Sequence, residues 1–195
     1  PSMEAEQARQ AELAKQTKPK PAPAGTTTNA AAPGLPGVST GATNMALPAA
    51  LKVGGARVDI DTPMVDGSIL LRGARLDHLR LKKYHDTVDP KSPEIVLLAP
   101  KSTDYPYYAE FGWVGAANMP TENSNWTQAS GDTLAPGKPV TLTWDNGKGL
   151  VFTRVIAIDD KYMFTVADSV ANKGAAAVNL FPYGYVARQS VPATT

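Results

Sequence analysis

The sequence predicts an all-β fold, an antiparallel β-sandwich, over the part of the chain that follows residue 50. Roughly ten short segments with strand-like alternation succeed one another there, separated by Gly, Pro, Asn or Asp residues. No segment after residue 50 has convincing helical periodicity. Short alternating strands with turn signals between them are typical of antiparallel sandwiches.

The first fifty residues are predicted to form a tether in front of this domain. Met3–Gln16 is rich in Ala, Glu, Gln and Lys but lacks a broad apolar stripe, so an isolated helix there would be marginal. Residues 17–50 are rich in Pro, Ala, Gly and Thr, which is typical of a flexible, partly extended linker. A merely disordered terminus is the open alternative. We expect a protease to cut between Lys15 and Lys52 well before Lys138.

The first half of the domain begins with a clear alternation. Val58 and Ile60 share one face of a predicted strand, while Asp59 and Asp61 share the other. Pro63 and Asp66-Gly67 are predicted to make a turn. The predicted strands of this half are 57–61, 68–72, 74–84, 94–99 and 107–114.

The second half contains the clearest hairpin. Val140, Leu142 and Trp144 alternate with polar residues, and Asn146-Gly147 then supplies the residue pair that a tight turn between antiparallel strands prefers. The predicted strands of this half are 140–145, 149–158, 161–170 and a last pair through residues 180 and 185.

Three aromatic residues lie on the apolar faces of these successive strands. They are Trp144, Phe152 and Phe164, and Phe152 shares its face with Leu150, Ile156 and Ile158. We therefore expect the three aromatic side chains to be buried together in the core.

Composition excludes several classes of site and partner. The chain has 19 basic and 18 acidic residues; residues 1–50 hold 4 and 3 of them, which leaves 15 of each in the remainder. A neutral domain lacks the basic surface that nucleic-acid binding requires. The absence of Cys excludes disulfides, thiolate metal sites and cysteine nucleophiles. No apolar run approaches the roughly 20 residues that span a bilayer, and no signal-peptide pattern is present.

The titratable residues offer no convincing metal site. His78 and His85 lie seven positions apart without a third ligand at suitable spacing, and His78 is predicted to face solvent in phase with Arg80. Asp59, Asp61 and Asp66 lack the ligand spacing of a calcium loop.

The remaining acidic and aromatic motifs have simple structural interpretations. Asp159-Asp160 is predicted to be a turn. Asn125-Trp126-Thr127 matches a glycosylation acceptor by chance. The densest aromatic cluster could stack on a sugar or hold an extended peptide, but packing of the sandwich is favoured. Its members are Tyr105, Tyr107, Tyr108, Phe111 and Trp113.

Seven runs along the chain form a pattern that is known from other proteins: residues 67–77, 81–84, 87–93, 107–113, 134–147, 162–166 and 180–184. In this order they resemble the periplasmic domain of YidC-type membrane protein insertases, particularly α-proteobacterial members. Each run consists mostly of strand and turn residues, and it is their order and their coverage from Arg57 to Arg188 that make the resemblance specific.

This resemblance implies an antiparallel β-supersandwich, similar to galactose-mutarotase-like sugar-binding folds, on the periplasmic side of the bacterial inner membrane. Residues 1–50 resemble a juxtamembrane segment and linker, and residues 51–195 a periplasmic domain truncated at its C-terminal end. The implied role is that of a non-catalytic docking or spacing module of an insertase that aids insertion and folding of membrane proteins, alone or with the Sec translocon. Sec accessory proteins and nascent membrane proteins are the implied partners.

The membrane segments in which the family performs its insertase work have no counterpart in this chain, so no functional residue carries over. The resemblance implies an apolar run of about 20 residues before Pro1 and more such runs after Thr195. The sequence therefore predicts no catalytic, cofactor-binding or metal residues.

A carbohydrate-binding or mutarotase-like periplasmic enzyme on the same fold is the alternative. Mutarotases pair a carboxylate base with a histidine acid. Glu110 and Asp145 are the available carboxylates, with His78 or His85 as the acid, but their spacing gives no support to such a pair.

Overall fold

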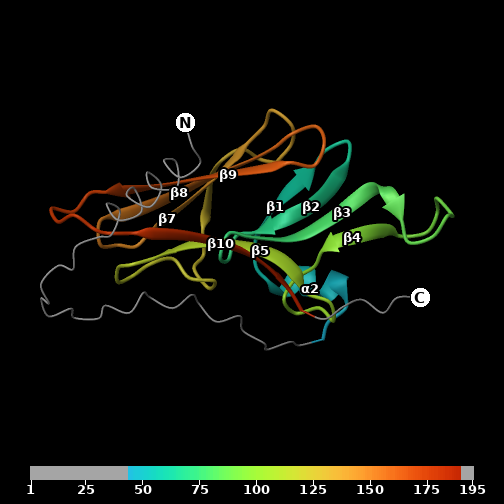
Figure 1. Cartoon of the computed structure of the whole chain (residues 1–195), viewed down its shortest axis with the longest axis horizontal. Coiled ribbons are helices and arrows are strands. Elements are labelled where there is room, and N and C mark those ends of the chain that lie inside the picture. The colour runs from blue at the N-terminus through green and yellow to red at the C-terminus, as the bar shows by residue number, and fades with distance from the viewer. Residues whose placement is uncertain (1–43, 190–195) are drawn as a thin grey trace, which may run out of the picture. The chain divides into compact units, whose positions relative to one another are not determined.

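The computed structural model describes residues 44–189, which form two antiparallel sheets and one short helix. The predicted tether, apart from residues 44–50, lies outside the described residues. The all-β sandwich predicted from the sequence is confirmed. Figure 1 labels its elements, and their bounds are α2 (Leu47–Val53), β1 (Arg57–Asp61), β2 (Val65–Leu70), β3 (Arg75–His85), β4 (Glu94–Leu98), β5 (Tyr107–Val114), β6 (Thr127–Ser130), β7 (Val140–Asp145), β8 (Leu150–Ile158), β9 (Phe164–Asn172) and β10 (Phe181–Arg188).

The first sheet has the order β1-β2-β3-β5-β10, and β4 also pairs with β3. The second sheet has the order β6-β7-β8-β9. Alternate residues of both sheets point into a shared core. Trp113 of β5 packs against Phe152 of β8 with ring centroids 4.9 Å apart, so the aromatic residues join the two layers.

The predicted aromatic trio is only partly correct. Phe152 is completely buried, and Trp144 packs against it with ring centroids 5.7 Å apart. Trp144 and Phe164 are half-buried, however, because Trp144 is next to the end of β7 and Phe164 begins the edge strand β9. Both still pack against the core cluster.

Gly67 is a strand residue, not the turn residue that was predicted. It lies inside β2 opposite Leu79, and a Cβ atom at this position would lie 2.1 Å from the backbone oxygen of His78. Glycine is therefore required for the close approach of two backbones. The turn instead uses Thr62, whose hydroxyl accepts hydrogen bonds from the backbone N–H groups of Met64 and Val65 at 3.1 and 2.9 Å.

Other strands also differ from the predictions. β9 begins at Phe164 because the Asp159 carboxylate accepts hydrogen bonds from the backbone N–H groups of Lys161 and Met163, both at 2.9 Å, which extends the turn. The predicted last strand pair is a single strand, β10, which pairs with β5 along its whole length. The four-residue β6 was missed, since it has no apolar alternation.

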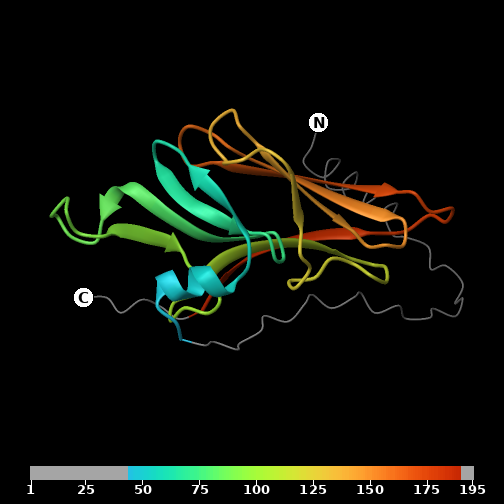
Figure 2. The ribbon, with the colours of Figure 1, turned by 180° about the vertical axis from the view of Figure 1, so that it is seen from behind.

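Helix α2 crosses the predicted boundary at residue 50 and lies over the outer face of the first sheet. Pro48 favours its start, and Ala50 is its one buried residue. Figures 1 and 2 show α2 on the side of β1–β3 that is turned away from β7–β9.

One loop receives both ends of the described chain. The backbone N–H of Met45 donates to the carbonyl of Ser102 at 2.8 Å, and that of Gln189 donates to the carbonyl of Pro106 at 3.0 Å. The chain thus enters and leaves the fold beside the loop of residues 100–106.

Candidate functional site

A β-bulge in β3 gathers charged side chains on the outer face of the first sheet. Ile69 of β2 lies opposite Leu76, but its neighbour Ser68 lies opposite His78, so Asp77 is the extra residue. The bulge places Asp77 on the same face as Arg75 and His78, away from the core that receives Leu76 and Leu79.

Arg75 and Glu110 form the centre of this outer face. The Arg75 Nε donates to Glu110 Oε1 at 2.6 Å, and each side chain is 7 % exposed. Lys101 Nζ lies 3.4 Å from the same oxygen, while the Tyr185 hydroxyl donates to the other carboxylate oxygen. Both oxygens of Glu110 are therefore occupied.

Glu122 extends the cluster from a neighbouring loop. Its carboxylate binds Lys101 and lies 3.7 Å from Arg75. The hydrogen bond from Lys101, together with the nearby positive charges, lowers the pKa of Glu122 despite its partial burial. Two cations and two carboxylates thus balance one another in the Arg75–Glu110 cluster, which comprises Arg75, Lys101, Glu110 and Glu122.

Arg57 and Asp77 form a second buried pair beside this cluster. Arg57 donates to Asp77 through one terminal nitrogen and to the Ser68 hydroxyl at 2.7 Å through Nε. Burial raises the pKa of Asp77, with Arg57 opposing the shift. The other terminal nitrogen of Arg57, Nη1, is buried and has no hydrogen-bond partner in the described structure.

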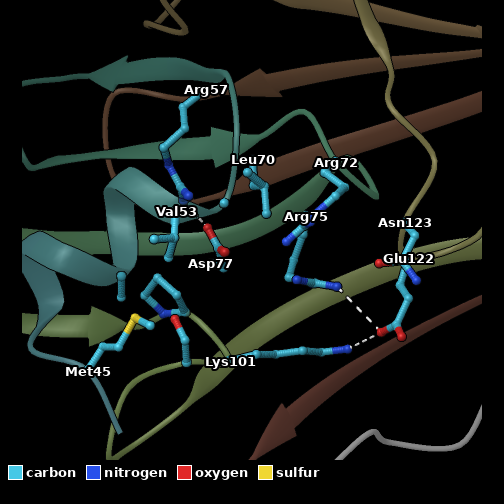
Figure 3. Close-up of a pocket in the computed structure, with 14 residues that line it drawn as sticks. Met45, Val53, Arg57, Leu70, Arg72, Arg75, Asp77, Lys101, Glu122 and Asn123 are labelled. Atoms are coloured by element: carbon cyan, nitrogen blue, oxygen red, sulfur yellow. Dashed lines mark hydrogen bonds and ion pairs between the residues drawn. The ribbon is translucent and has the colours of Figure 1, made fainter. Parts of the chain in front are cut away.

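A cavity of about 380 Å³ lies between these pairs and helix α2. Figure 3 shows Met45 and Val53 on one side of it and Arg72, Arg75 and Glu122 on the other. Its lining combines apolar and charged residues, which are Met45, Ala50, Val53, Gly54, Arg57, Leu70, Arg72, Arg75, Asp77, Pro100, Lys101, Ser102, Glu122 and Asn123. The volume is within the range of small-molecule sites.

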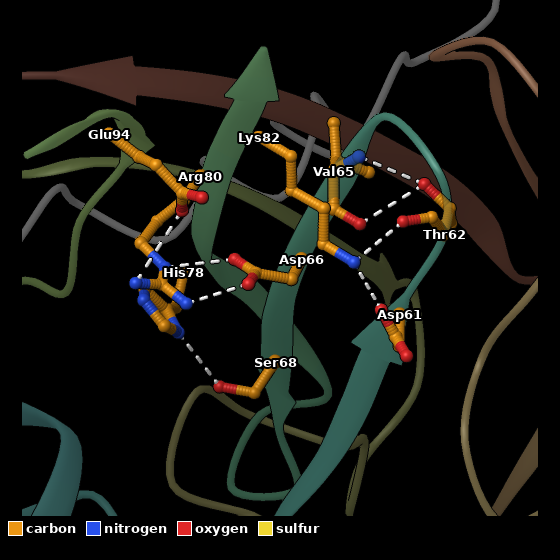
Figure 4. A network of polar contacts seen from close by, with 9 residues as sticks. All are labelled: Asp61, Thr62, Val65, Asp66, Ser68, His78, Arg80, Lys82 and Glu94. Atoms are coloured by element: carbon orange, nitrogen blue, oxygen red, sulfur yellow. Dashed lines mark hydrogen bonds and ion pairs between the residues drawn. The ribbon is translucent and has the colours of Figure 1, made fainter. Parts of the chain in front are cut away.

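The two histidines do not come together with the cluster. His78 lies on the outer face in phase with Arg80, as predicted, but it is half-buried and not open to solvent, because it packs beside Ser68, whose hydroxyl lies 3.2 Å from its Nδ1 (Figure 4). Burial and the charges of Arg57 and Arg80 lower the His78 pKa to about 4. His85 lies at the far end of β3, opposite Glu94.

Asp59, Asp61 and Asp66, the three aspartates that were compared with a calcium loop, have structural roles. Asp59 and Asp61 are exposed on β1, as expected. Asp66 accepts two hydrogen bonds from Arg80, at 2.8 and 2.6 Å (Figure 4). Among residues 44–189 no three His, Asp or Glu side chains are grouped so that they could hold a metal ion.

The two candidate mutarotase carboxylates lie in different sheets. Glu110 is buried in β5 of the first sheet. Asp145 is exposed at the end of β7, where its carboxylate accepts a hydrogen bond from the backbone N–H of Gly147 at 2.8 Å. Asp145 therefore stabilises the turn.

The aromatic cluster of β5 is divided between two environments. Trp113 belongs to the core and stacks on Trp126 at a centroid distance of 6.1 Å. Tyr108 is fully buried on the outer face, where Arg75 and Lys101 lie over its ring at 5.3 and 5.0 Å. Packing, the favoured interpretation, is correct for these two, whereas Tyr105 is half-exposed at the surface.

Three buried charged residues, Arg75, Asp77 and Arg154, were not predicted from the sequence, and Arg154 is the most completely buried of them. It is completely buried in β8, and its guanidinium lies 5.2 Å from the ring centroids of both Trp113 and Trp126. Asp168 of β9 accepts two hydrogen bonds from it at 2.8 and 3.0 Å. The signal was visible: Arg154 occupies a core position in the alternation of Phe152 and Ile156.

Comparison with known proteins gives a consistent family. The model of the YidC periplasmic domain matches residues 57–195. The chain is 60% identical over 140 residues to the membrane protein insertase YidC of Methylobacterium radiotolerans, covering 71% of this chain and 22% of that protein. The proteins of the same name in Methylorubrum extorquens and Bradyrhizobium diazoefficiens are 53% identical over 179 residues and 42% identical over 204 residues.

These matches cover most of this chain but a minor part of the relatives. The last two alignments cover 90% and 98% of this chain, and 29% and 33% of the respective relatives. The chain therefore spans between about a fifth and a third of the length of the relatives. In the described part of the chain, no helix has the length and apolar character needed to cross a membrane.

Proposed function

The chain belongs to the family of YidC periplasmic domains, and from this membership we propose that it is a non-catalytic docking or spacing module of a membrane protein insertase. Its place is the periplasmic side of the bacterial inner membrane. The insertase activity belongs to the longer protein, whose substrates are membrane proteins. The proposed partners of this domain are nascent membrane proteins and Sec accessory proteins.

The occupancy of Glu110 is the observation that favours a non-catalytic role. A general base needs a free carboxylate within reach of its substrate. Glu110 instead binds Arg75, Lys101 and Tyr185 and is almost completely buried. The arrangement supports a structural role for the outer face of β5 more than sugar chemistry.

A sugar panel separates this proposal from the carbohydrate-binding alternative. We expect no change in melting temperature when galactose, glucose and related sugars are added at millimolar concentration. A ligand stabilises a folded protein only if it binds to it, and a spacer domain does not bind these sugars. Polarimetry should likewise show no acceleration of galactose mutarotation. A sugar that raises the melting temperature of the native chain, and loses this effect in Glu110→Gln, would support the alternative instead.

Crosslinking in membranes tests the proposed partners. A photo-crosslinker at exposed positions of the domain, within the full-length protein, should capture nascent membrane proteins or Sec accessory proteins during synthesis. Exposed Tyr105 and Tyr162 are suitable positions on different loops. Absence of both kinds of adduct at every exposed position, with crosslinking intact in the membrane core, would contradict the docking role.

A further inference from the structure

We propose that the cavity beneath α2 binds an aliphatic carboxylate, a molecule with one carboxylate group attached to a short apolar chain. The charged side of the cavity would hold the carboxylate, and the apolar side would cover the chain. This inference concerns a site separate from the proposed partner contacts and goes beyond the docking role.

The charges around the cavity leave one positive charge in excess. Arg57 pairs with Asp77, and the four side chains of the Arg75–Glu110 cluster balance one another. Arg72 lines the same cavity, is exposed, and makes no ion pair within the described residues. One added negative charge would complete the balance.

A buried donor also lacks an acceptor. Arg57 is one of the residues that line the cavity, and its Nη1 is buried without a hydrogen-bond partner in the described structure. Buried donors are satisfied in the large majority of cases, so an unsatisfied one requires an explanation. A carboxylate supplies several acceptor sites and matches guanidinium geometry well.

The other side of the cavity suits a short hydrocarbon chain. Met45, Val53 and Leu70 line it, and Val53 is 58 % exposed (Figure 3). A ligand chain against these side chains would remove apolar surface from water, which favours binding roughly in proportion to the area covered. Acetate has no such chain and should bind less tightly.

The acidic side chains in the lining argue against other ligand charges. Asp77 and Glu122 would repel a dianion such as hydrogen phosphate, because a dianion carries two negative charges and the cavity lining has an excess of only one positive charge. A cationic ligand would face Arg57 and Arg72 without a free carboxylate, because Asp77 and Glu122 are already paired. A monoanion is the best match.

The test is a thermal-shift and calorimetric titration of the whole chain at constant ionic strength. Sodium hexanoate should raise the melting temperature progressively with concentration, since it binds the folded state. Sodium acetate should act more weakly, and hexylammonium chloride and hexanol should give no comparable shift. Equal shifts with hexanol or hexylammonium would overturn the proposal, and so would the absence of a shift with both hexanoate and a second carboxylate probe, N-acetyl-leucine.

Matched variants locate the site. Arg72→Gln should weaken hexanoate binding by about tenfold, the loss expected for one charged hydrogen bond. Lys138→Gln, which removes an exposed charge outside the cavity lining, should leave the affinity unchanged. Equal affinity in the native chain and in Arg72→Gln would show that hexanoate binds elsewhere and would contradict the site.

A second probe distinguishes two sources of the carboxylate. N-acetyl-leucine imitates the C-terminal residue of a polypeptide, whereas hexanoate imitates a free acid. Stabilisation by hexanoate points to a free acid, and stabilisation by N-acetyl-leucine alone points to a polypeptide terminus. Both outcomes, when sensitive to Arg72→Gln, support the shared chemistry; failure of both probes overturns it and leaves the crosslinking test of the docking role unaffected.

Discussion

Arg154 is a charged side chain inside an apolar face, and three kinds of contact hold it there. Asp168 neutralises it, the carbonyl of Ala74 lies 3.4 Å from its Nη1, and the rings of Trp113 and Trp126 both lie near the guanidinium. Cation–π contacts gain strength when the cation is desolvated. Because Arg154 belongs to the second sheet and Trp113 to the first, this residue connects the two layers.

Removal of Asp168 should therefore be costly. Asp168→Ala leaves the buried Arg154 charge uncompensated and should lower the free energy of unfolding by about 3–5 kcal/mol. Urea unfolding measures the loss. The double variant Arg154→Met/Asp168→Ala should recover a large part of it, because no buried charge remains. A double variant that is less stable than Asp168→Ala would contradict this account.

His78 should add a pH dependence to stability. Its folded pKa of about 4 lies below the ordinary value of 6.5, so the unfolded chain binds the proton first as the pH falls. Stability should be lost between about pH 6.5 and pH 4, on the order of 1–2 kcal/mol after allowance for solvent screening. The neighbouring Asp59, Asp66, Arg57 and Arg80 remain in His78→Asn, which lacks this component. Urea unfolding measures the free energy of unfolding of the native chain and of His78→Asn at each pH. The same dependence on pH in both proteins would contradict the prediction.

The charged outer face could not be predicted residue by residue. Strict alternation would put Asp77 and His78 on opposite faces, and only the bulge places both outside. The long-range pairs of the site, such as Arg75 with Glu110, depend on strand order, which the sequence does not encode locally. The burial of Arg154 could have been predicted, because this residue occupies a core-facing position in the alternation of β8 and such periodicity is visible in the local sequence.

At the scale of elements, strands with regular alternation were predicted well. β5 and β7 have the predicted bounds, and the face of β8 that holds Phe152 and Ile156 is the buried one. The errors arose where a side chain or a backbone contact overrode the pattern. Asp159 lengthened a turn, and Gly67 served a close approach inside a strand.

The phase of β7 and β8 leads to a paired stability prediction. Phe152→Ala removes a fully buried ring that contacts Trp113 and Trp144, and should cost about 3–5 kcal/mol. Thr143→Ala changes the opposite face of β7 and should cost less than about 1 kcal/mol. Chemical denaturation of both variants provides the comparison. Equal losses would mean that the two faces have been exchanged.

At the scale of the whole molecule, the two sheets share one core cluster. Trp113 in the first half of the described chain packs with Trp126, Phe152 and Ile156 in the second half. A core made from both sheets favours cooperative unfolding, because neither sheet can keep its apolar face buried alone.

Cooperativity can be measured with two probes. Tryptophan fluorescence reports on Trp113, Trp126 and Trp144, all of which pack in or against the core between the sheets, whereas far-ultraviolet circular dichroism reports on all strands. We expect the two urea transitions to coincide for the native chain. A fluorescence transition at clearly lower urea than the loss of strand signal would show that the sheets separate before they unfold.

The loop of residues 100–106 gives the domain a particular mechanical behaviour. Met45 and Gln189 are both hydrogen-bonded to it, so tension between the two chain ends acts first on this loop and on the short α2 beside it. The strands that hold the core would carry little of the load at first. A pull on the segment before Met45 would thus detach residues 45–53 and open the cavity beneath α2, while the sandwich itself stays folded.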